Sequence, residues 1–286
     1  LVKKTINFDD PTSYHFYFGN EDALPGSIIT FFPWEEGRKG KIGGGQVGIT
    51  TYIIPIGAMA FWEKRLENYG IATKRINRFG ESFLQFEDVH GLQLELVERE
   101  AGPLNNWEFN GVTKDVAIKG LGGSVLYSTN PKETAKTLEQ LLALEKIAED
   151  DDLIRFKSSS AFGRIIDLKK TAMERGVLGS GTVHHIAWRA NDHQELLRWQ
   201  QYIQKNGFYI TPVHDRKYFQ SVYFRENGKI LFEIATDSPG FTIDESKDKL
   251  GEQLKLPKQY EKDRLNLEEK LPQVTNNEIK PKKNDV

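Results

Sequence analysis

Two adjacent histidines and one glutamate are the side chains with the clearest potential for metal chemistry. His184 and His185 follow a Gly-Thr-Val segment, and Glu233 lies inside the apolar run Ile-Leu-Phe-Glu-Ile-Ala. An unpaired carboxylate is costly to bury, so Glu233 is expected to face a cation. Histidine and carboxylate ligands that leave open positions on the ion are typical of non-haem Fe(II) sites.

The two histidines are predicted to play different roles because they lie in one expected strand. Successive side chains of a strand leave opposite faces, so His185 shares a face with Val183 and Ala187, and His184 lies on the other. Small neighbours leave room for an ion beside His185. We predict His185 and Glu233 as metal ligands; the structural alternative is one core and one surface histidine without an ion.

Two residues between His185 and Glu233 are candidates for an outer shell around the ion. Arg216 can hold an anionic oxygen or a carboxylate, and Tyr223 can donate to a metal-bound oxygen. A rim salt bridge from Arg216 to Asp215 and plain strand packing of Tyr223 are equally open alternatives. The remaining histidines are predicted to be solvated or packing residues: His15, His90, His193 and His214.

These candidates belong to an internal repeat. Segments 47–97 and 182–236 each contain a strand, a helix that ends at a glycine, and three further strands. Residues matched at one constant offset are Arg78 with Arg216, Phe86 with Phe224, and Glu95 with Glu233. Alternation in each closing strand places the glutamate opposite the apolar face, so each unit is a βαβββ module.

Two weaker copies extend the repeat. Residues 123–168 form a third module with Asp167 at the glutamate position, and residues 1–32 form three strands of a module without its opening strand and helix. We therefore expect an α+β fold of four βαβββ modules, the first incomplete, packed as two curved sheets. About 24 residues are expected to precede Leu1, and their strand would supply a histidine as the third metal ligand.

The modules predict a division of the chain into four parts. A module pair spans 1–100 and a second pair spans 121–240, with a linker at 101–120 and a C-terminal extension at 241–286. The last dozen residues of the extension are predicted to be disordered. The edge and apolar face left uncovered in the first module favour a homo-oligomer.

The composition narrows the classes of partner. The 286 residues include 39 Lys and Arg against 41 Asp and Glu, which gives a net charge of -2. Nucleic-acid-binding proteins usually carry an excess of basic residues, so this balance argues against nucleic acid as a partner. Without cysteine the chain has no disulfide, zinc ribbon, iron–sulfur cluster or thiol nucleophile. No apolar run is long enough to span a membrane. We expect a cytoplasmic protein with a small-molecule partner.

Four stretches resemble the vicinal oxygen chelate superfamily, and most closely its ring-cleaving, hydroquinone-type dioxygenases. They are Gly181-Thr-Val-His-His-Ile-Ala-Trp188, the segment 215–225, Leu231-Phe-Glu-Ile-Ala-Thr-Asp-Ser-Pro-Gly-Phe241, and the segment 254–257. The resemblance implies Fe(II), with Mn(II) as the alternative ion, bound by His185, Glu233 and an N-terminal histidine. It places His184, Arg216 and Tyr223 around that ion.

The reaction implied by this resemblance is the opening of a hydroquinone- or catechol-like ring by O2 at Fe(II). Two other functions occur on the same fold and stay open at this point. One is a non-redox isomerase or thiol transferase of the glyoxalase type, and the other is a resistance protein that binds a small aromatic without turnover. The fold alone does not choose between them.

Overall fold

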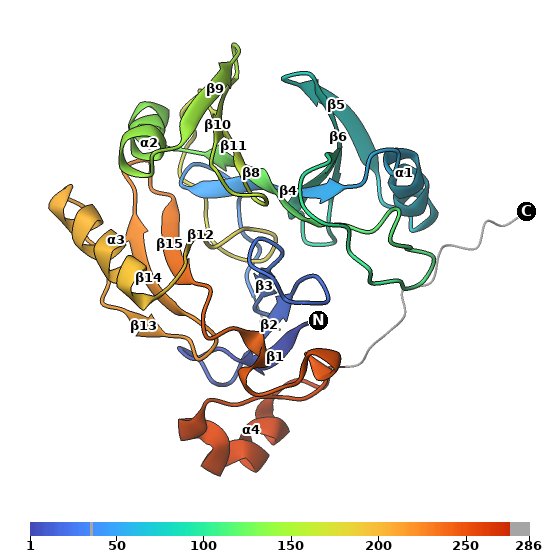
Figure 1. The fold of residues 1–286 in the computed structure, drawn as a ribbon, viewed down its shortest axis with the longest axis vertical. Coiled ribbons are helices and arrows are strands. Elements are labelled where there is room, and N and C mark those ends of the chain that lie inside the picture. Colours follow the sequence, from blue (N-terminus) through green and yellow to red (C-terminus); the bar gives the residue numbers. More distant parts are fainter. Residues whose placement is uncertain (35–36, 275–286) are drawn as a thin grey trace, which may run out of the picture.

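The largest sheet has eight strands and joins the second and third modules. In the computed structural model, which describes residues 1–34 and 37–274, its strand order is β5-β6-β7-β4-β8-β11-β10-β9. The second module contributes β4 (Gln46–Ile54), α1 (Met59–Asn68), β5 (Thr73–Arg78), β6 (Glu81–Glu87) and β7 (Gln93–Glu98). The third contributes β8 (Gly120–Tyr127), α2 (Pro131–Lys136), the π-helical turn η1 (Thr137–Leu141), β9 (Glu145–Glu149), β10 (Leu153–Lys157) and β11 (Ile165–Lys169). Its two outer arms rise on either side of the central β4–β8 pair (Figure 1).

Two smaller sheets carry the first and fourth modules. The fourth contains β12 (Ile186–Ala190), α3 (His193–Lys205), β13 (His214–Asp215), β14 (Gln220–Arg225) and β15 (Leu231–Thr236), in the sheet order β12-β15-β14-β13. The first contains β1 (Lys3–Ile6), β2 (Tyr14–Phe18) and β3 (Ile29–Phe31). Both lie on the same side of the eight-stranded sheet (Figure 1).

The repeated modules and the α+β class are confirmed, but the expected number of sheets is wrong. The structure has three sheets instead of two, because the opening strands β4 and β8 join the second module to the third, and the described residues of the first module contain no such strand. The predicted division into 1–100, 101–120, 121–240 and 241–286 stays a prediction. No helix of the described residues is long and apolar enough to cross a membrane.

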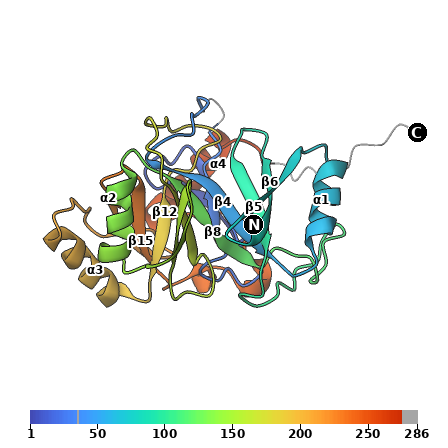
Figure 2. The ribbon, with the colours of Figure 1, turned by 90° about the horizontal axis from the view of Figure 1, so that it is seen from above.

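The helices lie on the outside of the sheets, as the view from above shows (Figure 2). Helix α3 begins at Asp192, whose side chain accepts from the Glu195 backbone N–H at 2.8 Å, and it buries Leu196 completely. Gly207 follows α3, and Gly70 follows α1, both with positive φ, as the sequence predicts. The chain therefore leaves each helix at a glycine and turns there towards the next strand.

The C-terminal extension packs against the first module. It consists of the short helices η2 (Phe241–Ile243), η3 (Lys247–Lys249), η4 (Lys258–Asp263) and α4 (Arg264–Lys270). Leu256, Leu267 and Leu271 form one apolar cluster with Ile6 of β1. Lys3 of the same strand is fully buried, and its ammonium contacts Asp244 at 2.7 Å and the Glu245 carboxylate. The predicted disorder of the last dozen residues lies outside the described residues.

Candidate metal and substrate site

A cleft of about 1760 Å³ is lined by residues of all four modules, with the first and fourth modules on one side and the eight-stranded sheet and its loops on the other. All five predicted site residues line it: His184, His185, Arg216, Tyr223 and Glu233. Aromatic side chains make up much of the remaining wall, among them Phe16, Phe32, Trp34, Phe162, Trp188 and Phe219. An apolar cleft with a few polar groups gathered at one place is typical of a small-molecule site.

His185 and Glu233 meet at the wall of this cleft. The Nε2 atom of His185 lies 2.7 Å from Oε2 of Glu233, a residue that is 3% exposed on β15. Burial alone would raise the pKa of Glu233, but the attraction of His185 and the hydrogen bonds from His185, Tyr223 and Ser221 lower it below its usual value. The carboxylate is therefore ionised and can act as an anionic ligand.

Tyr223 and Arg216 surround this pair differently from the sequence-based alternatives. The Tyr223 hydroxyl donates to Oε1 of Glu233 at 2.6 Å and accepts from the Ser221 hydroxyl at 3.1 Å. The Arg216 guanidinium lies 5.7 Å from the centre of the Tyr223 ring and donates to Asp9 at 3.1 Å. Tyr223 therefore orients the carboxylate, and Arg216 brings a positive charge to the cleft without contacting Asp215.

The prediction that His184 and His185 face opposite sides is wrong. Strand β12 begins only at Ile186, so the alternation of a strand does not apply to the two histidines. Their Nδ1 atoms lie 2.8 Å apart, and both rings line the cleft. One proton lies between these two Nδ1 atoms, and the protonation state of His185 decides which ring carries it. Burial, and then the charges of His185 and Arg225, lower the pKa of His184 to about 4.

His15 lines the cleft, a position that the sequence analysis did not predict for it. It lies on β2, stacks on Phe32 with ring centres 4.2 Å apart, and has Nδ1 3.0 Å from the Tyr17 hydroxyl. Its Nε2 is buried and has no hydrogen-bond partner among the described residues. Burial, and then the charge of His185, lower its pKa to about 3. Alternation along β2, which puts His15 and Tyr17 on one face, was the signal available.

The donors at this wall are suited in kind to a divalent ion that takes nitrogen and oxygen ligands. An imidazole nitrogen and an ionised carboxylate oxygen already meet there. Within residues 1–34 and 37–274, no three His, Asp or Glu side chains gather closely enough to hold one ion. The described residues thus bring together two side chains of the kind that bind such an ion, His185 and Glu233, and their role as ligands stays a prediction.

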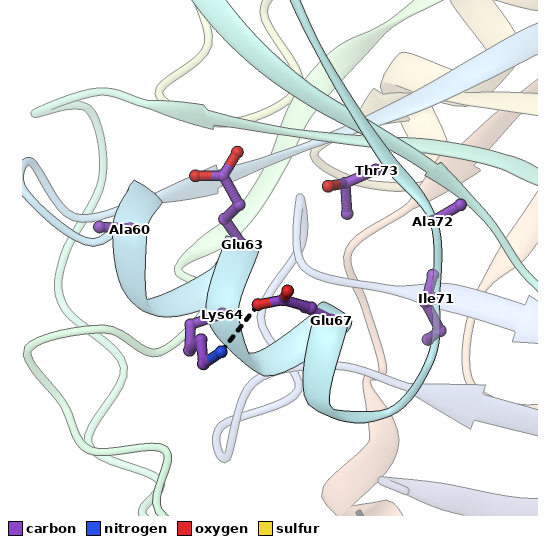
Figure 3. A pocket seen from close by; sticks show the side chains of 7 residues that line it. All are labelled: Ala60, Glu63, Lys64, Glu67, Ile71, Ala72 and Thr73. Atoms are coloured by element: carbon purple, nitrogen blue, oxygen red, sulfur yellow. Dashed lines mark hydrogen bonds and ion pairs between the residues drawn. The ribbon is translucent and has the colours of Figure 1, made fainter. Parts of the chain in front are cut away.

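A smaller cavity lies on the opposite flank of the molecule, between α1 and β5 (Figure 3). Its charged side chains are Glu63, Lys64 and Glu67, and Lys64 pairs with Glu67 at 2.9 Å on the exposed face of the helix. Glu63 is tied to Arg75 at 2.6 Å. The three charged side chains that line this cavity are therefore all in exposed ion pairs, and the cavity resembles an ordinary charged surface of a helix.

No protein-family model matches the sequence. Two relatives cover most of the chain. MhqO of Bacillus subtilis, which carries the name of a ring-cleaving dioxygenase, is 56% identical over 271 residues, covering 95% of this chain and 87% of that protein. The chlorohydroquinone/hydroquinone 1,2-dioxygenase of Sphingobium indicum is 32% identical over 273 residues, covering 91% of this chain and 84% of that enzyme.

Solved structures agree with these relatives. A crystal structure named for a dioxygenase of Bacillus subtilis superposes with a TM-score of 0.95 at 55% identity, covering 96% of this chain and 89% of the other. Glyoxalase I of Zea mays shares the fold, with a TM-score of 0.59 at 14% identity and 83% of each chain covered. The chain is therefore an enzyme that belongs to the ring-cleaving dioxygenase family, and it has the vicinal oxygen chelate fold.

Proposed function

We propose that this enzyme uses Fe(II) to open hydroquinone- or catechol-like aromatic rings with O2. The observation that carries the proposal is the contact between His185 and the buried, ionised Glu233 at the wall of an aromatic cleft. The 32% identity to a chlorohydroquinone/hydroquinone 1,2-dioxygenase supports the substrate class. Mn(II) is the alternative ion, since it accepts the same kinds of ligand.

His185 would hold the ion through Nε2, and Glu233 through its carboxylate. When bound, Fe(II) supplies the redox chemistry that lets O2 react with an aromatic ring. Nε2 must lose its proton to act as a ligand, so the neutral His185 ring would then carry its proton on Nδ1 and donate to Nδ1 of His184. His184 would thus fix the orientation of His185.

The remaining residues bind and orient. Tyr223 holds Oε1 of Glu233, so Oε2, which contacts His185 in this structure, is the oxygen that would bind an ion. Arg216 places a positive charge beside the Tyr223 ring, and this charge would stabilise an ionised phenol oxygen of the substrate. The aromatic walls would pack against the substrate ring and exclude water. His184, Arg216 and Tyr223 are therefore proposed as catalytic residues around the ligands His185 and Glu233.

The test is oxygen consumption by the Fe(II)-loaded enzyme with hydroquinone and with catechol, measured by an oxygen electrode alongside the absorbance of the ring-opened product. We expect O2 uptake that requires Fe(II), and loss of uptake in Glu233→Gln. Glu63→Gln, on the exposed face of α1, is the matched control and should keep full activity. A rate that depends on a thiol and not on O2 would instead establish a glyoxalase-type isomerase. Binding of either aromatic without uptake would establish a resistance protein.

The cytoplasmic location and the homo-oligomer remain proposals beside this function. Membership of an enzyme family that acts on small aromatics agrees with a partner set of substrate and O2. Size-exclusion chromatography with light scattering measures the oligomeric state directly, and a monomer across a wide range of protein concentrations would contradict the homo-oligomer.

A further inference from the structure

We propose that His15 is a specificity-determining residue whose Nε2–H group donates a hydrogen bond to a second oxygen of the aromatic substrate, distinct from the oxygen held at His185 and Glu233. The inference rests on the proposed function and deepens it. It begins from His15, a residue that lines the cleft and whose buried Nε2 atom has no hydrogen-bond partner among the described residues. Buried polar groups are nearly always paired, so this atom requires a partner.

The tautomer of His15 follows from Tyr17. The Tyr17 side chain is 1% exposed, and burial raises the pKa of its hydroxyl well above the usual value, so the hydroxyl keeps its proton. The one hydrogen bond of that hydroxyl among the described residues is to Nδ1 of His15, at 3.0 Å. A buried O–H needs an acceptor, so Nδ1 accepts, and the ring proton of the neutral imidazole resides on Nε2.

This tautomer makes Nε2 a donor and sets its chemistry apart from that of a metal ligand. Metal coordination through Nε2 would require the opposite tautomer, in which Nδ1–H donates to Tyr17 and the buried hydroxyl hydrogen of Tyr17 loses its acceptor. His15 also does not join His185 and Glu233 in a group of three that could hold one ion within the described chain. The partner that suits Nε2–H is therefore an oxygen acceptor.

The position of His15 indicates which oxygen that is. Its ring is fixed by the Phe32 stack and by the pairing of β2 with β1, where His15 lies opposite Thr5. His15 lines the same cleft as His185, Glu233 and Arg216, and these three groups are close enough for their charges to act on its ring. A substrate oxygen at His185 and Glu233 is separate from one at His15, so the pair selects a ring with two oxygens placed apart, as in a hydroquinone.

The experiment is anaerobic isothermal titration of hydroquinone and of phenol, which lacks the second oxygen, into the Mn(II)-loaded protein. Loss of one hydrogen bond weakens binding by about 3- to 10-fold. We therefore expect His15→Phe to weaken hydroquinone binding by about that factor and to leave phenol binding unchanged. His15→Gln, which restores an N–H donor, should recover most of the preference for hydroquinone.

Phenylalanine at position 15 leaves the Tyr17 hydroxyl without its acceptor, so the double variant His15→Phe/Tyr17→Phe, which removes both polar groups, is the control for folding and should lose the same preference. Equal weakening of hydroquinone and phenol, or of neither, would overturn the proposal. Weaker Mn(II) binding in His15→Phe, followed by electron paramagnetic resonance, would overturn it in favour of a metal ligand.

Failure of this inference and failure of the proposed function give different results. If the wild-type enzyme consumes O2 with hydroquinone, but His15→Phe keeps the wild-type preference for hydroquinone over phenol, only the role of His15 is wrong. If the wild-type enzyme neither binds hydroquinone nor consumes O2 with it, the substrate class and the role of His15 are both wrong.

Discussion

Glu95 and Glu233 occupy the same place in two copies of one module, yet they meet different partners. The register of the sheets makes them equivalent: β4 places Thr51 beside Glu95, and β12 places Ala187 beside Glu233. Both carboxylates are almost completely buried on a closing strand. The comparison therefore shows what surrounds an identical carboxylate at two places in one protein. We call the surroundings of Glu95 in the eight-stranded sheet the arginine cup and compare them with the cleft around Glu233.

In the eight-stranded sheet the carboxylate is neutralised by arginine. Arg78 donates hydrogen bonds to both carboxylate oxygens of Glu95 and also donates from Nε to Asp167 at 2.6 Å. Arg155 holds the other oxygen of Asp167 at 2.7 Å, and the Gln85 amide donates to Glu95 at 3.1 Å. Every charge in this cup is paired within the protein, so no site for an added cation is left.

In the cleft the equivalent arginine, Arg216, does not contact the glutamate. Arg216 contacts Asp9 and makes no bond to Glu233, while Tyr223 takes the place of Gln85 and His185 supplies the partner of the carboxylate. Counting two residues back from the paired strand positions, His185 corresponds to Ile49. The same module position therefore has two outcomes. Where the arginine contacts the glutamate, the pair is part of a structural ion-pair network; where it does not, the glutamate is a candidate metal ligand.

The largest expected effect is loss of the metal from the cleft. His185→Ala and Glu233→Gln each remove one of the two proposed ligands. A change in an outer-shell residue usually lowers metal affinity or activity by about 10- to 100-fold, so metal retention and O2 uptake should fall by more than that in these two variants. Metal analysis after gel filtration measures this, and thermal unfolding checks that the fold persists. Retention of stoichiometric metal by both variants would break the comparison.

The equivalent change in the arginine cup should act on stability instead. Glu95→Gln leaves Arg78 buried with only part of its partners, and breaking a buried ion pair costs about 3–5 kcal/mol. Urea unfolding followed by circular dichroism should show that loss, while metal content per folded molecule stays that of the wild type. Loss of metal at unchanged stability would mean that the arginine cup also serves the ion.

Tyr223→Phe sharpens the comparison through the residue that orients the carboxylate. The variant should keep its metal and lower turnover by about 10- to 100-fold, because Glu233 loses the 2.6 Å hydrogen bond that fixes one oxygen. Gln85→Leu is the matched change in the arginine cup and should leave turnover unaltered. Equal turnover in Tyr223→Phe and the wild type would assign Tyr223 to packing.

The smallest expected effect concerns acid stability of the arginine cup. Burial raises the pKa of Glu81, but the hydrogen bonds and charges of Arg99 and Arg155 outweigh it, so the folded pKa lies below the usual value of 4.5. The contribution of Glu81 to stability is then present above pH 4.5 and is lost as the pH falls through the lowered pKa. Glu81→Gln should flatten the pH dependence of the unfolding midpoint in that window; an unchanged slope would contradict it.

The module frame was predictable because it rests on local patterns. Strand alternation, glycine-ended helices and a constant offset fixed Glu233 at the close of the fourth module, and the structure places it there. The same offset aligned Arg78 with Arg216. The alignment does not predict where either guanidinium points, because a carboxylate far away in the sequence decides that direction. Arg78 points to Asp167, and Arg216 points to Asp9.

Two features of the site were not predictable from local pattern. The facing of His184 depends on where β12 starts, and that start is set by pairing with β15 far along the chain. His15 reaches the cleft because the first module packs beside the fourth, which is a tertiary arrangement. Periodicity assigns a residue to a face of its own strand, but it does not say which other module that face meets.

The buried Lys3 has a consequence for the order of assembly. Its ammonium is paired with Asp244, 241 positions away in the chain, and the backbone of Lys255 donates to the carbonyl of Lys4. Contacts of such long sequence separation form slowly, since a large loop must close before they stabilise anything. The sheet that carries His15 is synthesised before the segment after Phe241, and β1 is covered only once that segment is present. A ribosome that stalls before that point would hold a chain in which Ile6 lacks its apolar cover and Lys3 lacks the carboxylates that pair it.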